Sequence, residues 1–330
     1  MPGAQRSFCR NCIAGTEALS QISFFDGLLA LRGWRRSTLA KEMPGSVTSV
    51  FSEPDDFQAA LHADGVVSLL VTGQGQFRAR LTQVTIEHLY LSAGDEQLSR
   101  IAFVAAPADM ILVALPIGDR AVPIWGGIAM QAGEVLSFGP GERIPARTDG
   151  PCRWGTIRSP SEYLAQYGRV LNGAELVLRP AARWRPPRAA LRQLRHLHQA
   201  AVRRVEARSD VLADLETAHG LEQQLTHALV ECLGNGSAIE VPPATTEHRD
   251  IAARFEALLQ DRPLQGLRIA EIRKGLDVSA PALRMACKEQ LGMGPLAYIR
   301  HLSRQTKRVQ PRVKSVCKQQ SLCSQYPNAK

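Results

Sequence analysis

The chain has 330 residues, of which 45% are hydrophobic, and a formal net charge of +9. This length allows two domains, and the apolar content is sufficient to form real cores. No run approaches the roughly 20 apolar residues that cross a bilayer. The segment from Ile22 to Leu31 carries Asp26 and lacks a small-residue cleavage site, which argues against a signal peptide. We therefore expect a cytoplasmic protein with no membrane partner.

The positive charge is concentrated near the C-terminus. Residues 262–330 contain 14 lysines and arginines against 3 acidic residues, a net charge of +11. Residues 1–261 contain 26 against 28, a net charge of −2. This asymmetry is typical of a phosphate-neutralising domain joined to one that does not bind nucleic acid, although a solvated basic tail contributes part of it.

The seven cysteines are too few and too scattered to form a disulfide framework. Cys9 and Cys12 form a C-x-x-C pair, but no second pair lies at zinc-finger spacing, so we expect no metal there. Cys152, Cys232 and Cys287 lie in apolar surroundings, which predicts that they are small core residues.

The first two regions of the chain differ in texture. Residues 1–45 form an N-terminal extension with an apolar patch around Phe24 and Leu28, which is either one short packed helix or a segment without fixed structure. Residues 46–183 contain short apolar runs at roughly ten-residue spacing, separated by glycine and proline, which favours an antiparallel β barrel or sandwich. In this region Phe77, Ala79 and Leu81 alternate with Arg78, Arg80 and Thr82, which predicts one buried face and one wet face.

Residues 184–233 are predicted to be a helical connector. After the proline-containing run 184–188, apolar residues recur at helical spacing, and a stripe that includes Leu221, Leu225 and Leu229 is broad enough for a packed helix pair. This stripe either covers the barrel of its own chain or forms a dimer contact. Residues 234–246 have the composition of a linker.

The C-terminal unit, residues 247–304, contains the most specific pattern. Ile269, Ile272 and Leu276 share one face of a short helix, and a second helix follows the break at 277–279. Ser279 is placed to cap this second helix, with a proline in its first turn and Gly292 at its end. A helix, a tight turn and a second helix are the parts of a helix-turn-helix unit, and an ordinary helical hairpin is the alternative.

The sequences IAEIRKGLDVS at 269–279 and LGMGPLAYI at 291–299 resemble the first helix-turn-helix of the AraC/XylS family of bacterial transcription regulators. The resemblance covers only Leu267 to Leu302. It implies an α+β protein with an N-terminal cupin-like antiparallel β barrel or sandwich for sensing and dimerisation. A helical connector and a C-terminal all-α helix-turn-helix follow in that arrangement, and double-stranded DNA at a promoter or operator is the implied partner.

Within such a unit the second helix reads the DNA. Arg284 can offer its planar guanidinium to guanine O6 and N7, whereas Lys288 is better placed for phosphates, which fix register without reading sequence. Residues at the start of the helix have little to read with beyond a thymine methyl group. The predicted DNA-binding residues are Arg284, Lys288, Ala280, Pro281, Arg273, Lys274 and Ser279.

The β region offers no chemistry for catalysis. The segment 133–142 is similar to a cupin turn, but the position of the family's metal histidine falls near Pro145. His62 and His88 are far apart and lack an H-x-H partner, so we expect no metal, no cofactor and no enzyme activity. If the β domain binds a small-molecule effector, its lining would include apolar strand residues that otherwise form plain core: Phe77, Leu81, Trp125 and Phe138.

The chain departs from the family after Leu302. Family members continue into a second helix-turn-helix, whereas residues 305–330 here contain Pro311 and few apolar residues, which predicts a disordered basic tail. We expect a regulator truncated after its first helix-turn-helix that acts as a homodimer. The alternative is a truncated, non-DNA-binding or dominant-negative relic that only dimerises through its N-terminal region.

Overall fold

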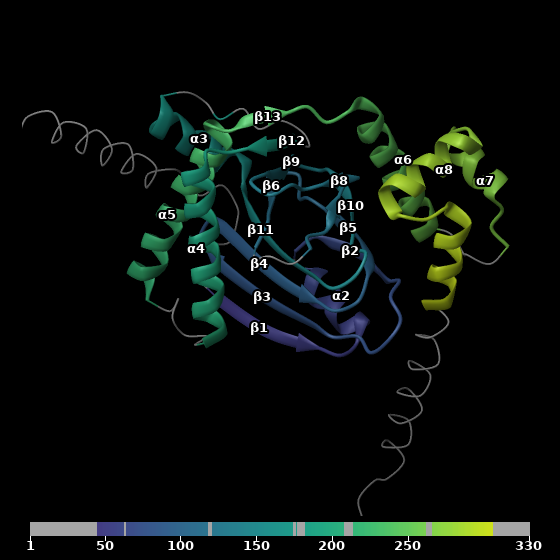
Figure 1. The fold of residues 1–330 in the computed structure, drawn as a ribbon, viewed down its shortest axis with the longest axis horizontal. Helices are drawn as coiled ribbons and strands as arrows, with labels where there is room; N and C mark the ends of the chain where they lie inside the picture. The colour runs from purple at the N-terminus through teal and green to yellow at the C-terminus, as the bar shows by residue number, and fades with distance from the viewer. Residues whose placement is uncertain are drawn as a thin grey trace, which may run out of the picture.

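The computed structural model describes residues 45–62, 64–117, 121–173, 176, 182–207, 214–261 and 266–305. Apart from residues at their borders, the predicted N-terminal extension with its C-x-x-C pair and the predicted basic tail lie outside this described part. Figure 1 shows β-sheets in the centre of the molecule, with one group of helices on each side. Within the described residues, no helix combines the length and the apolar character needed to span a bilayer.

Two antiparallel sheets form the body. The larger has the strand order β1-β3-β4-β11-β6-β9-β12-β13, and the smaller has the order β2-β5-β10-β7-β8. A helix, α2 (Pro54–His62), follows the first strand. The strands of the larger sheet are β1 (Gly45–Phe51), β3 (Ala79–Ile86), β4 (Leu89–Glu96), β11 (Cys152–Pro160), β6 (Met110–Leu115), β9 (Val135–Phe138), β12 (Ala182–Arg185) and β13 (Ser237–Ile239). Those of the smaller are β2 (Val66–Val71), β5 (Arg100–Ala105), β10 (Arg143–Arg147), β7 (Ile124–Trp125) and β8 (Ile128–Ala129).

The alternation predicted for β3 is confirmed with one exception. Phe77, Ala79 and Leu81 are buried in the core between the sheets, and the intervening arginines are exposed. The prediction of a wet position was wrong for Thr82, which is only 1% exposed. Its hydroxyl lies within hydrogen-bond distance of Glu206, which belongs to a helix that covers this face of the sheet. The sequence predicts a solvent-exposed surface at this position.

Three helices cover the outer face of the larger sheet: α3 (Ser161–Asn172), α4 (Arg188–Ala207) and α5 (Leu215–Gly234). The apolar stripe of α5, including Leu225 and Leu229, packs into one hydrophobic core with the strands and with α4. The stripe therefore covers the β domain of its own chain, which was one of the two alternatives. Cys152, Cys232 and Cys287 are buried free thiols, as predicted.

The segment predicted as a linker, residues 234–246, contains regular structure. Ser237–Ile239 form β13, which pairs with β12, and the next helix, α6 (Pro243–Gln260), begins at a proline that suits a first helical turn. Only residues 240–242 connect that strand to α6.

The C-terminal helices share a core with the smaller sheet. The helices are α6, α7 (Ile269–Leu276), α8 (Ala280–Leu291) and a helical segment at 295–305. Their apolar faces meet Leu70, Ile101 and Phe103 of β2 and β5 in a single buried cluster. Figure 1 shows α6 and α8 beside the edge of the body where β2, β5 and β10 lie. The helical unit is thus docked on the β domain.

Candidate nucleic-acid interface

The turn between α7 and α8 is defined by two residues. Asp277 ends α7 in the left-handed conformation, with φ 53° and ψ 49°, and its N–H bonds back to the last carbonyls of that helix. Ser279 then caps α8, because its hydroxyl accepts a hydrogen bond from the backbone N–H of Ala282 at 3.2 Å. The predicted cap and the predicted break are both confirmed.

The far end of α8 also follows the sequence signals. Gly292 takes φ 74° and donates its N–H to the carbonyl of Lys288 at 3.1 Å. Pro295 opens the helical segment at 295–305. Helix α8 is therefore fixed at both ends by residues that could be read from the sequence.

The inner side of α8 is fully packed. Leu283, Ala286 and Leu291 are at most 2% exposed and contact the core that includes Phe255 of α6 and Ile272 of α7. A helix with one side buried in this way presents its opposite side to solvent.

That opposite side carries the residues predicted to read DNA. Pro281, Arg284, Met285 and Lys288 are all exposed, and their spacing of three, four and seven places them on one helical face. Met285 is 56% exposed, which is unusual for a large apolar side chain. Ala280 is half-buried at the start of the helix. The outer face of α8 therefore offers two cations and an apolar side chain together.

The remaining candidates lie at the turn. Lys274 is exposed in the last turn of α7, whereas Arg273 is half-buried and its Nε has no hydrogen-bond partner within the described chain. Ser279 is exposed but uses its hydroxyl as the helix cap. The turn thus adds an exposed cation, Lys274, and a half-buried cation, Arg273, beside the outer face of α8. Contact of any of these residues with DNA stays a prediction.

One buried carboxylate ties the helical unit to the sheet. Glu256 of α6 is 1% exposed and accepts hydrogen bonds from the Tyr298 hydroxyl at 2.6 Å and from the Ser68 hydroxyl on β2 at 2.7 Å. Burial raises the pKa of Tyr298 well above its ordinary value, and the negative charge of Glu256 acts in the same direction. The tyrosine therefore remains a donor, and both donors keep the carboxylate satisfied.

Two further contacts fix the docking. Arg249 of α6 lies 3.2 Å from the carboxylate of Glu142, which precedes β10. The Gln305 amide donates to the backbone carbonyl of Leu69 on β2 at 2.9 Å. These contacts leave the outer face of α8 free to meet another molecule.

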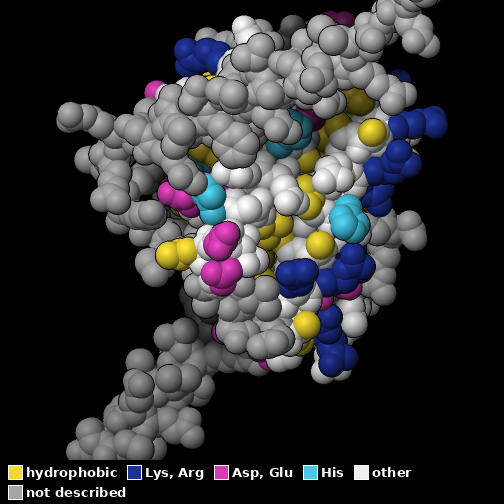
Figure 2. Space-filling view, turned by 90° about the vertical axis from the view of Figure 1, so that its left-hand side faces the viewer, with side chains coloured by type: hydrophobic (Ala, Val, Ile, Leu, Met, Phe, Trp, Pro, Cys, Tyr) yellow, Lys and Arg dark blue, Asp and Glu magenta, His cyan; other side chains and the backbone are white. Residues whose placement is uncertain are grey.

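A second basic surface lies on the opposite side of the molecule. Figure 2 shows the face that carries α4 and α5, where basic side chains gather along one side of a strip of hydrophobic atoms. On α4 the exposed arginines are Arg188, Arg192, Arg203 and Arg204. Exposed positive charge is therefore not confined to the outer face of α8.

The residues predicted to line an effector site do not line the cavity beside α4. Phe77, Leu81, Trp125 and Phe138 are all buried in the core between the sheets. A cavity of about 200 Å³ lies instead between α4 and the strands β3 and β4. It is lined by apolar residues and by the charged side chains Arg80, Asp95, Arg153, Arg203 and Glu206.

His198 of α4 lines the same cavity. It is 0% exposed, and its Nε2 lies 3.3 Å from the carbonyl of Thr156. Burial lowers the pKa of His198 to about 4, so the ring is neutral in the folded protein at neutral pH.

The structure also gathers residues that the sequence left apart. His88 lies in the turn between β3 and β4, and its Nδ1 is 2.9 Å from Glu222 of α5. Glu87 completes a cluster whose ligand atoms all lie within 4.8 Å of one another. His88 and Glu222 are 134 residues apart, so no local sequence pattern predicts their contact.

No family model and no curated protein matches this sequence. Among solved structures, the AraC-like transcriptional activator CuxR matches with 14% identity and a TM-score of 0.41, covering 79% of this chain and 94% of that one. An apo single-residue variant of ToxT from Vibrio cholerae matches with 9% identity and a TM-score of 0.24, covering 69% and 80%. Neither similarity is close enough to decide what this chain does, so its own geometry has to decide it.

Proposed function

We propose that this protein is a DNA-binding transcription regulator that reads promoter or operator DNA with a C-terminal helix-turn-helix of AraC type. The observation that carries the proposal is the outer face of α8, where Arg284, Met285 and Lys288 stand exposed on a helix whose other side is buried. An α-helix fits the major groove of B-form DNA, and the second helix of such a unit is the one that enters it.

The chemistry of the face supports this use. The Arg284 guanidinium can form two parallel hydrogen bonds to one guanine, whereas Lys288 acts as a point charge toward phosphate. Met285 can make an apolar contact with the methyl group of a thymine in the major groove. Lys274 and Arg273 on the neighbouring helix would add phosphate contacts that set the register.

The test is a titration of the full chain against labelled DNA from the upstream region of its own gene and against a scrambled duplex. Fluorescence anisotropy at two salt concentrations distinguishes contacts with bases from contacts with phosphates. Arg284→Ala should weaken specific binding by roughly 5- to 150-fold and scarcely change binding to the scrambled duplex. Lys288→Ala should weaken both and reduce the slope of log affinity against log salt by about 1.

Arg192→Ala on α4 is the matched control, since it removes an exposed arginine from a helix that is not proposed to read DNA. Its affinity for the specific duplex should equal that of the unaltered chain. Equal affinities for the specific and scrambled duplexes would instead favour the relic that only dimerises.

Homodimerisation belongs to the same proposal. One helix pair reaches few phosphates, so two copies bound to adjacent half-sites would raise the affinity for DNA. Sedimentation of the chain at several concentrations, alone and with a two-half-site duplex, measures this directly. A monomer that binds the specific duplex one-to-one would remove the dimer from the proposal.

A further inference from the structure

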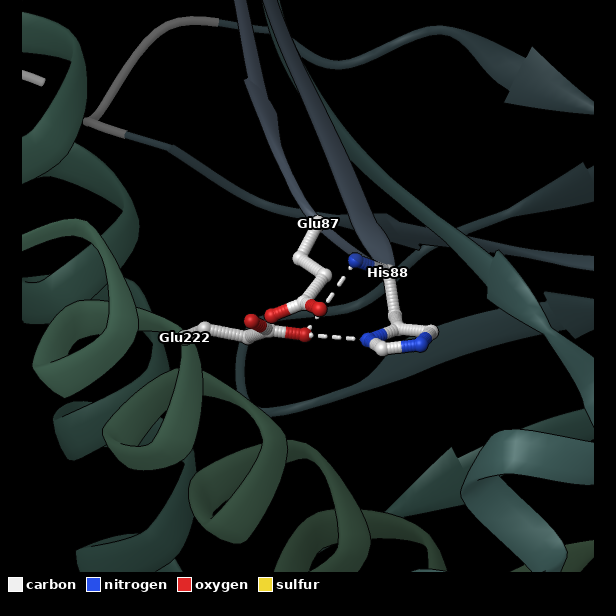
Figure 3. Close-up of side chains that lie close together, drawn as sticks. All are labelled: Glu87, His88 and Glu222. Atoms are coloured by element: carbon white, nitrogen blue, oxygen red, sulfur yellow. Dashed lines mark hydrogen bonds and ion pairs between the residues drawn. The ribbon is translucent and has the colours of Figure 1, made fainter. Parts of the chain in front are cut away.

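We propose that Glu87, His88 and Glu222 form a binding site for a divalent transition-metal ion of the zinc class, between the β3–β4 turn and helix α5. The site is independent of the proposed DNA-reading face, which lies on the other side of the β domain (Figure 1). Figure 3 shows the carboxylates of Glu87 and Glu222 side by side, with the ring of His88 turned toward Glu222.

The histidine is held in place from two directions. Its ring stacks on Tyr163 of α3, with centroids 4.3 Å apart and planes 5° from parallel. Its backbone N–H also donates to Glu222 at 3.2 Å. The ring nitrogen Nδ1 is thus aimed at the carboxylate of Glu222 before any ligand arrives, which is the preorganisation that a ligand histidine requires.

Glu222 supplies the observation that points to a missing partner. The residue is 2% exposed, and its Oε2 accepts no hydrogen bond within the described part of the chain. A buried carboxylate with one unsatisfied oxygen is costly unless a cation or a proton completes it.

A second carboxylate nearby favours a cation over a proton as the partner of Glu222. Glu87 brings its side chain within 4.8 Å of the ligand atoms of both other residues. Two carboxylates at this separation repel each other in a partly buried site, and a divalent ion between them converts that repulsion into attraction. His219, one turn before Gln223 on α5, lies 3.9 Å from Glu87 and adds a second imidazole at the rim.

The donor set selects the class of ion. Imidazole nitrogen with carboxylate oxygen suits zinc and its neighbours, whereas calcium and magnesium take oxygen ligands. Three protein ligands also leave a position for water or for His219, as in an open zinc site.

The experiment is a calorimetric titration of Zn²⁺ into the full chain after chelator treatment, with Mg²⁺ as the competing probe. We expect one zinc per chain at this cluster, no competition from Mg²⁺, and proton release that makes the affinity weaken as the pH falls. Because thiols of the full chain also bind zinc, Co²⁺ spectra are recorded in parallel. Nitrogen and oxygen ligation gives d–d bands without the sulfur-to-cobalt charge-transfer band.

Three variants locate the ion. Glu87→Gln changes a half-exposed turn residue and should lower the affinity at least tenfold without unfolding the chain. Glu222→Gln should do the same, and its circular dichroism spectrum reports whether the buried change is tolerated. Glu216→Gln, on an exposed position of the same helix, is the control and should bind as the unaltered chain does.

The outcomes are distinct. Loss of zinc in Glu87→Gln but not in Glu216→Gln supports the site. Absence of zinc uptake, uptake with only a thiolate spectrum, or equal affinity in all variants overturns it. None of these results depends on DNA binding, so the metal site and the regulator proposal fail or stand separately.

Discussion

Two neighbouring leucines on β2 point into different cores, and this makes the docking of the C-terminal helices testable. Leu70 lies in the cluster shared with α6, α7 and α8, whereas Leu69 lies in the core between the two sheets. The two side chains are 2% and 3% exposed, so they are matched in type, in burial and in strand. Truncation of each to alanine therefore separates the two interfaces.

The expected cost is similar for both changes. Leucine-to-alanine substitutions at buried positions destabilise proteins by about 2–5 kcal/mol, which combines lost transfer energy with the cavity left behind. In Leu70→Ala this loss falls on the contact between the sheet and the helical unit. In Leu69→Ala it falls on the interior of the β domain, while the backbone carbonyl that accepts from Gln305 is retained.

Native-state hydrogen exchange followed by mass spectrometry distinguishes them. In Leu70→Ala, amides of α6 and α8 should exchange at least about thirtyfold faster, the equivalent of 2 kcal/mol. In Leu69→Ala the increase should appear in the strands that surround the inter-sheet core. Urea unfolding of both variants gives the global stability against which these local changes are compared.

The result that refutes the reasoning is equally specific. If both variants raise exchange uniformly over the chain, the helices and the sheets unfold as one unit and no separate docking step exists. If Leu70→Ala leaves the exchange of α6 and α8 unchanged, the shared core does not hold the helical unit in place.

Two other predictions concern single side chains. His198 has a folded pKa of about 4 against an ordinary value of 6.5, so the unfolded state binds more protons in that window and stability falls as the pH falls. Between pH 7 and pH 5 the unfolding free energy should drop by about 2 kcal/mol in urea titrations, and His198→Gln should lose this component; an unchanged pH profile would contradict it. Asp277→Gly should raise the free energy of unfolding by about 0.5–1 kcal/mol. Glycine avoids the steric strain of a Cβ atom at φ 53°, and the greater freedom of glycine in the unfolded chain offsets part of this gain. Asp277→Ala is the comparison variant, and a lower melting temperature for glycine than for alanine would exclude strain at this turn.

The parts of the fold that sequence predicted are those with local causes. Ser279 caps α8 and Gly292 ends it because each interaction involves residues within four positions along the chain. The strand alternation at Phe77 and Leu81 has the same local character. Such signals can be recognised without knowing the tertiary structure.

The missed features arise from contacts between distant segments. Thr82 looked solvent-exposed because nothing in its strand predicts that α4 lies above it. The three-residue strand β13 was hidden in a segment with linker composition, since its stability comes from pairing with β12. The pairing of His88 with Glu222 depends on the position of α5 over the β3–β4 turn, which no local pattern encodes.

The short connection between β13 and α6 limits how the C-terminal helical unit can be repositioned. Residues 240–242 are the whole tether, and three residues extend to at most about 11 Å. Release of the unit from the smaller sheet would thus leave its first helix within one helix diameter of the sheet edge unless β13 also separates from β12. While β13 stays paired with β12, the C-terminal helical unit can therefore tilt or loosen on the sheet but cannot move away from it.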